Sequence, residues 1–291
     1  MSEDKAVVAV VTGATRGVGK GVAVELGAAG ATVYVTGRST SIGEPHPLGG
    51  SVEETAALVT GAGGHGVPIA CDHQRDDQVA RVFEDIGRAE KKIDVLVNNV
   101  TAIPRDLAKP GPFWEKSIGL ARMLDVGLRT HYVATHCAAP LLLASDQGLV
   151  AFTSSYGARC YMHGPAYGAG KAGVDKMAMD MAVDFRPHDV SVVSLWLGFV
   201  RTERNAPLFD HPRAAEGPYG EFLANAESPR FIGRVIGALR ESAQRMDYSG
   251  RVLIAAEVAQ ELGVTESDGR QPRSSRHTLA EPPSPSPVII R

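Results

Sequence analysis

Tyr167 and Lys171 are the two residues whose types and spacing point most directly to chemistry. They stand four positions apart in a segment of helical character, so both side chains project from the same helix face. A free tyrosine has a pKa of about 10 and is a poor acid–base catalyst at neutral pH. A nearby ammonium favours the phenolate and brings that pKa closer to the working range. Such a pair also occurs on ordinary helix surfaces, so the neighbouring motifs decide between the two interpretations.

Two serines, Ser154 and Ser155, end an apolar run upstream of the tyrosine. At the end of a strand, a hydroxyl of this pair can hydrogen-bond a substrate oxygen. Because a glycine-rich loop also precedes them in the chain, the combination of serine, tyrosine and lysine favours a proton-transfer site over a plain helix surface.

That loop, with the sequence TGATRGVG, follows the first apolar run of the chain. Its three glycines let the backbone turn tightly and approach a pyrophosphate, whose charge then faces the N-terminus of the next helix. The simpler interpretation is a tight strand–helix turn without a ligand. The position after the first strand of a βαβ unit favours cofactor binding instead. The residues expected to contact a dinucleotide here are Gly13, Thr15, Arg16, Gly17, Val18 and Gly19.

The end of the second expected strand indicates which dinucleotide is bound. An NAD site usually places an acidic residue there for the ribose hydroxyls, whereas this strand ends in Val35-Thr36-Gly37-Arg38. Arg38 and Arg16 can clamp a 2′-phosphate, although two solvated surface arginines are the alternative. We therefore expect NADP(H), with NAD(H) as a possible cofactor. Asp72, after the third strand, is expected to reach the adenine.

Asn98 and Asn99 end the fourth expected strand, at the edge of the sheet where cofactors bind. An Asn pair can simply terminate a strand, but its place in the series of strand ends makes it informative. We expect Asn98 to belong to the cofactor site.

Short apolar, β-branched runs alternate with longer segments of helical period. The expected strands cover residues 7–11, 32–36, 67–71, 95–97, 149–153, 190–197 and 251–254. The expected helices cover residues 17–29, 52–60, 74–90, 120–143, 166–185 and 229–240. Continuously apolar strands are typical of a parallel sheet that is buried on both faces. The sequence predicts an α/β protein with one Rossmann-type, doubly wound parallel sheet of about seven strands and helices on both faces.

The composition indicates an ordinary globular protein. Of its 291 residues, 44% are hydrophobic and 22% are charged, and the net charge of −3 gives no indication of a nucleic-acid partner. Three scattered cysteines favour reduced thiols and a cytoplasmic location. No segment approaches the roughly 18 apolar residues of a membrane span. His131 and His136 are off the helical spacing of a shared metal site, so no metal is expected.

The domain organisation follows from the same composition. Residues 1–268 are expected to form one domain that holds both the cofactor and the substrate. The segment 205–220, rich in Pro and Gly, is either a lid over a pocket or a surface excursion. The Pro- and Ser-rich tail, residues 269–291, is expected to be disordered, or to pack against the core or a neighbouring subunit.

Together these motifs resemble the short-chain dehydrogenase/reductase family, over residues 6–269. The resemblance implies that Tyr167 donates a proton in carbonyl reduction and accepts one in alcohol oxidation. Lys171 would lower the pKa of Tyr167 and hold the nicotinamide ribose. Ser155 would orient and polarise the carbonyl, with Ser154 as the alternative.

The resemblance also assigns Val200 and Thr202 to the nicotinamide carboxamide, and it comes with three departures. Asp125 stands where the family usually has an asparagine that holds a water near the lysine. A carboxylate there either keeps that water or pairs with Lys171 and weakens its effect on Tyr167. The usual Asn-Asn-Ala-Gly reads NNVT, and the usual Pro-Gly after the sixth strand reads Leu-Gly.

The expected function is NADP(H)-dependent interconversion of a carbonyl and an alcohol by a homodimer or homotetramer. Apolar residues flank the expected pocket mouth and favour a hydrophobic ketone, quinone or steroid-like substrate. They are Phe113, Trp114, Tyr161, Met162, Leu208 and Phe209. The competing hypothesis is a non-enzymatic NADP(H) sensor or scaffold on the same fold. Dehydration or epimerisation would use the same residues and stays open.

Overall fold

The computed structural model of the chain describes residues 6–290, except 44–45, 212–215 and 217–219. Its centre is a seven-stranded sheet with the order β3-β2-β1-β4-β5-β6-β7, and every neighbouring pair is parallel. The order reverses between β1 and β4, which is the position where doubly wound sheets open a crevice for ligands. The predicted fold class is confirmed.

The strands lie close to their predicted positions and are short and apolar. They are β1 (Val8–Thr12), β2 (Thr32–Gly37), β3 (His65–Ala70), β4 (Val95–Asn98), β5 (Leu149–Ser154), β6 (Ser191–Trp196) and β7 (Val252–Ile254). Six of them are buried along nearly their whole length, whereas β3, at the edge of the sheet, is largely half-exposed or exposed. Burial on both faces explains why the inner strands show no alternation of polar and apolar residues.

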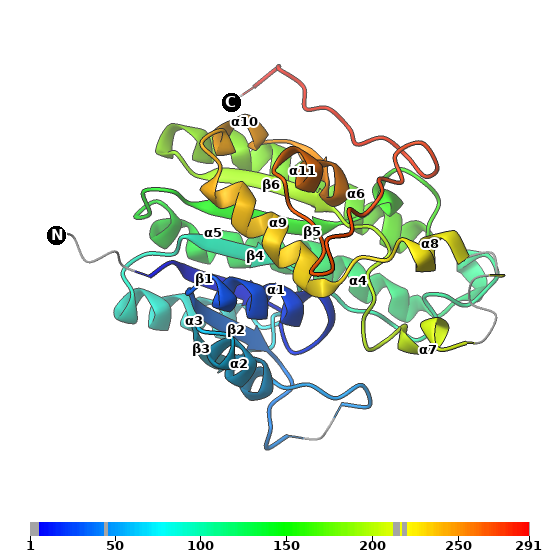
Figure 1. Ribbon diagram of the computed structural model, residues 1–291, viewed down its shortest axis with the longest axis horizontal. Helices are drawn as coiled ribbons and strands as arrows, with labels where there is room; N and C mark the ends of the chain where they lie inside the picture. The colour runs from blue at the N-terminus through cyan, green and yellow to red at the C-terminus, as the bar shows by residue number, and fades with distance from the viewer. Residues whose placement is uncertain (1–5, 44–45, 212–215, 217–219, 291) are drawn as a thin grey trace.

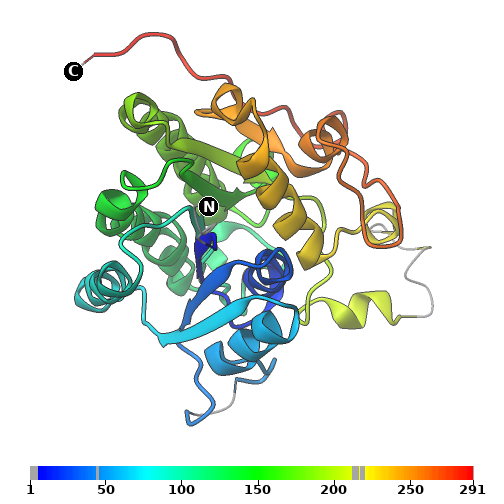
Figure 2. The same ribbon diagram turned by 60° about the vertical axis from the view of Figure 1, so that its left-hand side comes forward.

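Helices cover both faces of the sheet, and Figure 2 shows the two layers on either side of it. One face packs against α1 (Gly17–Ala28), α2 (Val52–Gly61), α9 (Pro229–Glu241) and α11 (Ala255–Glu261). The other face packs against α3 (Asp76–Ala89), α5 (Thr130–Leu142) and α6 (Pro165–Phe185). Shorter helices are α4 (Arg122–Leu124), α7 (Ala206–Phe209), α8 (Gly220–Ala224) and α10 (Arg245–Tyr248). None of the helices in the described ranges is long and apolar enough to cross a bilayer.

The helix predicted over residues 120–143 is broken in the structure. Helical turns cover residues 118–125, and regular helix resumes at Thr130, but Val126 and Gly127 between them have non-helical backbone angles. The carbonyl of Val126 accepts a hydrogen bond from the backbone N–H of Ala102 at 2.8 Å. A side chain at Gly127 would lie 2.9 Å from Thr101 Oγ1. The break thus lets the chain after β4 pack against this segment, a long-range contact that helical periodicity does not reveal.

The first part of the C-terminal tail packs against the domain, alongside α8 and α11 (Figure 1). The backbone N–H of Arg273 donates to Asn225 Oδ1, Arg276 pairs with Glu257, and Leu279 packs against the cluster around Trp196. These contacts involve residues 273–280, and the expectation for the tail as a whole stays a prediction. Of the segment 205–220, the residues 212–215 and 217–219 lie outside the described residues, so the lid hypothesis stays untested.

Asp94 forms hydrogen bonds that link β1, β4 and β5 at their amino ends. The predicted site lies at the opposite, carboxyl ends of the strands. The carboxylate of Asp94 accepts hydrogen bonds from the backbone N–H of Val8 at 2.9 Å, from Ser145 Oγ at 2.6 Å and from Lys92 Nζ at 3.0 Å. Its backbone N–H donates to Val8 and its carbonyl accepts from Leu149. Burial alone would raise the pKa of Asp94, but these hydrogen bonds outweigh burial and lower it.

We predict that Asp94→Asn lowers the free energy of unfolding by about 1–3 kcal/mol, because buried donors lose a charged acceptor. Since the pKa of Asp94 is lowered in the folded protein, its contribution is present at neutral pH and is lost on acidification. Urea unfolding at pH 7 measures the effect. The control is Asp180→Asn, which breaks an exposed ion pair with Lys176 and should change stability by less than about 0.5 kcal/mol. Equal effects of the two variants would contradict this account.

Candidate active site

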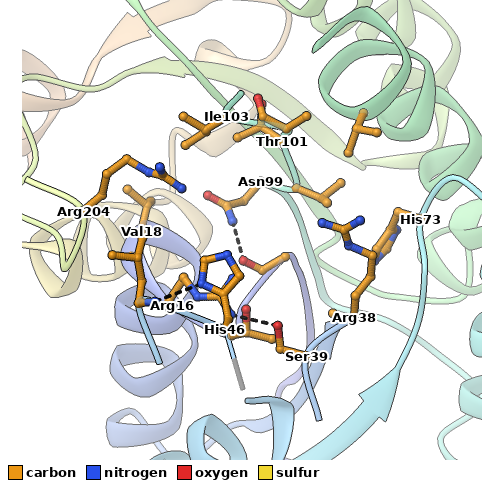
Figure 3. Close-up of a pocket in the computed structure, with 18 of the residues that line it drawn as sticks. Arg16, Val18, Arg38, Ser39, His46, His73, Asn99, Thr101, Ile103 and Arg204 are labelled. Carbon is orange, nitrogen blue, oxygen red and sulfur yellow. Dashed lines mark hydrogen bonds between the residues drawn. The ribbon is translucent and has the colours of Figure 1, made fainter. Parts of the chain in front are cut away.

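A cavity of about 480 Å³ opens at the carboxyl ends of β1, β2 and β4. The predicted glycine-rich loop lines it with Gly13, Thr15, Arg16, Gly17 and Val18. Figure 3 labels Arg16 and Val18 of this loop. Gly13 has a φ of +66°, and a side chain there would meet Val100 Cα at 2.7 Å. Glycine is therefore required for this close approach of two backbones. The loop and the chain after β4 together form one narrow wall of the cavity.

Asn99 holds the glycine-rich loop in place. Its side-chain amide donates to the carbonyls of Thr12 at 3.0 Å and Gly13 at 3.1 Å, and Figure 3 shows it pointing at the loop. Asn98, the residue expected to reach the cofactor, instead lies in the core and donates to Thr135 Oγ1 at 2.8 Å. The structure thus places Asn99 in the cavity wall and Asn98 outside it, because alternate residues of a strand point to opposite sides.

Glu203 is a residue of this cavity that the sequence analysis missed. Its carboxylate accepts a hydrogen bond from the backbone N–H of Gly17 at 2.9 Å, at the N-terminus of α1. The helix end therefore accepts negative charge here, as a pyrophosphate site must. The only signal in the sequence was that Glu203 directly follows Thr202, which also lines the cavity.

The far end of the cavity carries the predicted arginines. Arg38 lines the cavity, is exposed, and its guanidinium has no hydrogen bond or ion pair among the described residues. Arg16 donates instead to Ser39 Oγ at 2.8 Å and to the carbonyls of Gly49 and Gly50, so it holds the loop before α2. Figure 3 shows Arg38 beside His73, on the other side of the view from Arg204. Arg38 and Arg204 are therefore the arginines of the cavity that have no partner among the described residues.

Two groups after β3 complete this end of the cavity. Asp72 lines it, and one of its carboxylate oxygens accepts from the backbone N–H of Gln74 at 3.1 Å. His73 Nε2 is hydrogen-bonded to Thr36 Oγ1 at 2.8 Å, and burial lowers the pKa of its imidazole to about 4. His73 is thus neutral at pH 7 and adds no charge beside Arg38.

The Tyr167 hydroxyl and the Ser155 hydroxyl are 2.7 Å apart, which makes them hydrogen-bonded partners. Ser155 follows the carboxyl end of β5, and Asn99 follows the carboxyl end of β4. The two residues lie on the same side because β4 and β5 are parallel, with Asn98 opposite Phe152. Ser154 turns the other way, and its hydroxyl is 3.4 Å from the carbonyl oxygen of Lys171. Of the two predicted serines, Ser155 is therefore the one that faces the tyrosine.

Lys171 lies one turn after Tyr167 on α6, with its Nζ 5.9 Å from the centre of the tyrosine ring. The ammonium donates to the carbonyl of Thr153 at 2.9 Å. Burial lowers the pKa of Lys171 to about 8, although Asp175 acts in the opposite direction. Burial also raises the pKa of Tyr167, against the hydrogen bond with Ser155. The protein surroundings therefore raise the pKa of Tyr167, and the lowering expected from Lys171 together with a bound nicotinamide stays a prediction.

Asp125 lies away from Lys171 in the structure. It stands at the break before α5, its side chain is exposed, and the charge it acts on is that of Arg129. The pairing with Lys171 that was one of its two expected effects is absent among the described contacts of Lys171. Its expected role in holding a water stays a prediction.

The turn after β6 places Thr202, but not Val200, in the cavity wall. Glu227, which is buried, accepts from the backbone N–H of Gly198 at 2.9 Å, and its own backbone pairs with Val200. The carbonyl of Val200 accepts from the Asn205 side chain. Backbone contacts with Glu227 thus stabilise the turn where the expected Pro-Gly is replaced by Leu-Gly.

Apolar side chains surround the reactive groups. Leu107, Leu120 and Met123 form a small cluster against which Tyr167 packs. Phe113 and Trp114, which were expected at the pocket mouth, contact each other edge to face and are exposed. Neither of them lines the cavity, so their expected place at the pocket mouth stays a prediction.

Comparisons with known proteins agree with this geometry. A family model described as short chain dehydrogenase matches residues 7–213. Dehydrogenase/reductase SDR family member 1 from Mus musculus is 37% identical over 276 residues, which cover 91% of this chain and 85% of the mouse protein. The Homo sapiens protein of the same name is 35% identical over 271 residues, which cover 90% of this chain and 84% of that protein.

A crystal structure of a short-chain type dehydrogenase/reductase from Mycobacterium marinum has the same fold, with a TM-score of 0.68 and 22% identity. The match covers 85% of this chain and 92% of that one. The family model spans well over half of the chain, and the two mammalian proteins exceed 30% identity over nearly all of it. On this evidence the chain belongs to the short-chain dehydrogenase/reductase family of oxidoreductases.

Proposed function

We propose that the protein interconverts a carbonyl and an alcohol with NADP(H), acting on a hydrophobic ketone, quinone or steroid-like substrate. The observation that carries this proposal is the pair of hydroxyls, Ser155 and Tyr167, at 2.7 Å from each other and one helical turn from Lys171. A scaffold or sensor that only binds a cofactor has no use for this arrangement. The apolar cluster of Leu107, Leu120 and Met123 against Tyr167 supports an apolar substrate.

The described residues fit a dinucleotide. The cavity beside the glycine-rich loop would hold a pyrophosphate, and the hydrogen bond from Gly17 to the Glu203 carboxylate supports an anion at the end of α1. Arg38, with no competing partner, would hold a 2′-phosphate, and Asp72 would face the adenine end. Thr202, which lines the cavity, would meet the nicotinamide end. Hydride transfer is the chemistry that the cofactor supplies when bound.

Ser155 and Tyr167 would act on the oxygen of the substrate. In reduction, Ser155 donates a hydrogen bond to the carbonyl oxygen, and the Tyr167 hydroxyl gives its proton to that oxygen as the hydride reaches the carbon. The raised pKa of Tyr167 keeps the hydroxyl protonated at neutral pH, as a proton donor must be. Lys171, still mostly charged at pH 7, stabilises the phenolate that remains.

We predict that Arg38→Ala weakens NADPH binding by about 10- to 100-fold, because a charged hydrogen-bonding partner of the 2′-phosphate is removed. NADH lacks that phosphate, so its affinity should change little. Fluorescence titration of both cofactors measures the two dissociation constants. Arg88→Ala, at an exposed arginine on α3 that pairs with Asp85, is the control. Equal weakening of NADH and NADPH by Arg38→Ala would contradict the assignment of NADP(H).

We predict that Tyr167→Phe and Ser155→Ala each lower kcat for carbonyl reduction by at least about 100-fold, because proton donation and carbonyl polarisation are lost. NADPH binding should persist in both variants. Steady-state NADPH oxidation with a panel of hydrophobic ketones and quinones measures this. Ser154→Ala is the comparison variant and should lose less activity, since that hydroxyl faces the backbone of Lys171 and the Asp175 carboxylate and not Tyr167. If Ser154→Ala lost as much activity as Ser155→Ala, the assignment of Ser155 would be wrong.

We predict that Glu203→Gln strengthens NADPH binding by about two- to fivefold at low ionic strength. The carboxylate stands where a pyrophosphate would bind, so removing its charge removes a competitor. The measurement is the NADPH dissociation constant at two salt concentrations, and the gain should shrink as salt rises. Weaker binding in the variant would show that Glu203 helps to hold the cofactor instead.

A cytoplasmic homodimer or homotetramer belongs to the same proposal. All three cysteines are free in the structure, in keeping with a reducing compartment. Light scattering during gel filtration would measure the size of the assembly.

A further inference from the structure

Asp175 continues the row of reactive residues on α6. Tyr167, Lys171 and Asp175 follow one another at intervals of four, so all three lie along one face of the helix. Asp175 is only 2% exposed. A buried carboxylate is costly unless it is hydrogen-bonded and close to a positive charge, so its presence in this position calls for partners.

Both carboxylate oxygens of Asp175 are held by β6. Ser194 Oγ donates to Oδ1 at 2.7 Å, and Trp196 Nε1 donates to Oδ2 at 2.8 Å. Both donors are themselves fully buried. The Trp196 ring also packs against Tyr156, with ring centres 5.1 Å apart, and Tyr156 directly follows Ser155. The carboxylate is therefore fixed in direction, by a strand and a ring that also contact the segment of the proposed catalytic serine.

The groups that face Lys171 come from three elements. From α6 itself come the Tyr167 ring and the Asp175 carboxylate, and the end of β5 contributes the carbonyl of Thr153. His131 comes from α5, and its Nε2 is hydrogen-bonded to the carbonyl of Val100. Burial and the nearby Lys171 lower the pKa of His131 to about 3, so this imidazole is neutral. Asp175 is thus the carboxylate that favours the Lys171 ammonium among the described residues, and it does so without forming a salt bridge. Burial raises the pKa of Asp175 itself, while its side-chain hydrogen bonds and the nearby Lys171 act against that effect.

We propose that Asp175 is a positioning residue that keeps Lys171 charged beside the site of proton transfer. This inference rests on the proposed function and deepens it, by assigning to Asp175 the role of a fixed counter-charge. It acts through Lys171 and does not touch the reacting atoms.

The proposal has a definite consequence for the titration of Lys171. Burial lowers the pKa of Lys171 to about 8, and Asp175 opposes this effect. Without Asp175, the pKa must fall further, so the ammonium would lose its proton at a lower pH. The neutral amine no longer stabilises a phenolate, and carbonyl reduction should fall off as pH rises through the new value.

The test is a titration of Lys171 by NMR in protein labelled with carbon-13 lysine, with Lys171→Arg used to assign the signal. In Asp175→Asn we expect the midpoint to fall by about one pH unit or more relative to wild type. Asp180→Asn, on the same helix but in an exposed pair with Lys176, should leave it unchanged. Should Asp175→Asn fold poorly, Ser194→Ala removes one of the side-chain donors to the carboxylate and should shift the midpoint in the same direction by less.

A second readout separates this role from a structural one. The pH above which kcat/KM for NADPH-dependent reduction declines should move down in Asp175→Asn by the same amount as the Lys171 midpoint. An unchanged Lys171 midpoint in a folded Asp175→Asn protein would overturn the proposal. Because the NMR titration needs no substrate, it tests Asp175 even if no carbonyl is reduced, in which case the proposed function alone fails.

Discussion

The constraint on which the site depends is the placement of an ammonium group in a largely apolar, partly buried position between α6 and β5. Such a charge is tolerated only with well-placed partners, and the fold supplies them from separate elements. The end of β5 provides the carbonyl of Thr153, and β6 provides the two donors that fix the Asp175 carboxylate. Because β5 and β6 are parallel, these groups lie together at the carboxyl ends of the two strands, beside the hydroxyls of Ser155 and Tyr167.

The other half of the site is governed by negative charge. The end of α1 and the Arg38 guanidinium, which is unpaired among the described residues, both line the cavity and suit a ligand with phosphate groups. Glu203 now satisfies part of this positive potential by accepting from Gly17. The two halves meet at the chain after β4, where Asn99 and Val100 line the cavity. At the helix break, the carbonyl of Val126 accepts a hydrogen bond from the backbone N–H of Ala102.

Sequence could predict the features that are encoded locally. The apolar runs predicted the positions of the strands to within a few residues, and the glycine spacing identified the loop at the switch point between β1 and β4. The spacing of Tyr167 and Lys171, together with a serine at a strand end, was enough to expect that these three residues come together.

Features that depend on packing between distant segments could not be predicted in the same way. The break at Val126 and Gly127 depends on contacts with Thr101 and Ala102, so the helical periodicity of the sequence could not predict it. The side chain of Asn99, and not that of Asn98, faces the loop, because the register of β4 decides which side chain points there; the cofactor contact expected of Asn98 stays a prediction. Asp175 had a usable signal, its spacing of four from Lys171, but its burial and its bonds to β6 required the fold.

The most direct test of the central claim is to follow the transferred hydrogen. The protein would be incubated with NADPH deuterated at the reactive face of nicotinamide C4 and with hydrophobic ketones and quinones, and the products analysed by mass spectrometry and NMR. Our account predicts an alcohol that carries deuterium on the former carbonyl carbon of a ketone, formed in step with cofactor oxidation. Product formed without net cofactor oxidation would instead indicate dehydration or epimerisation. Tight NADPH binding without any transfer across the panel would contradict the proposed reductase and favour a cofactor sensor.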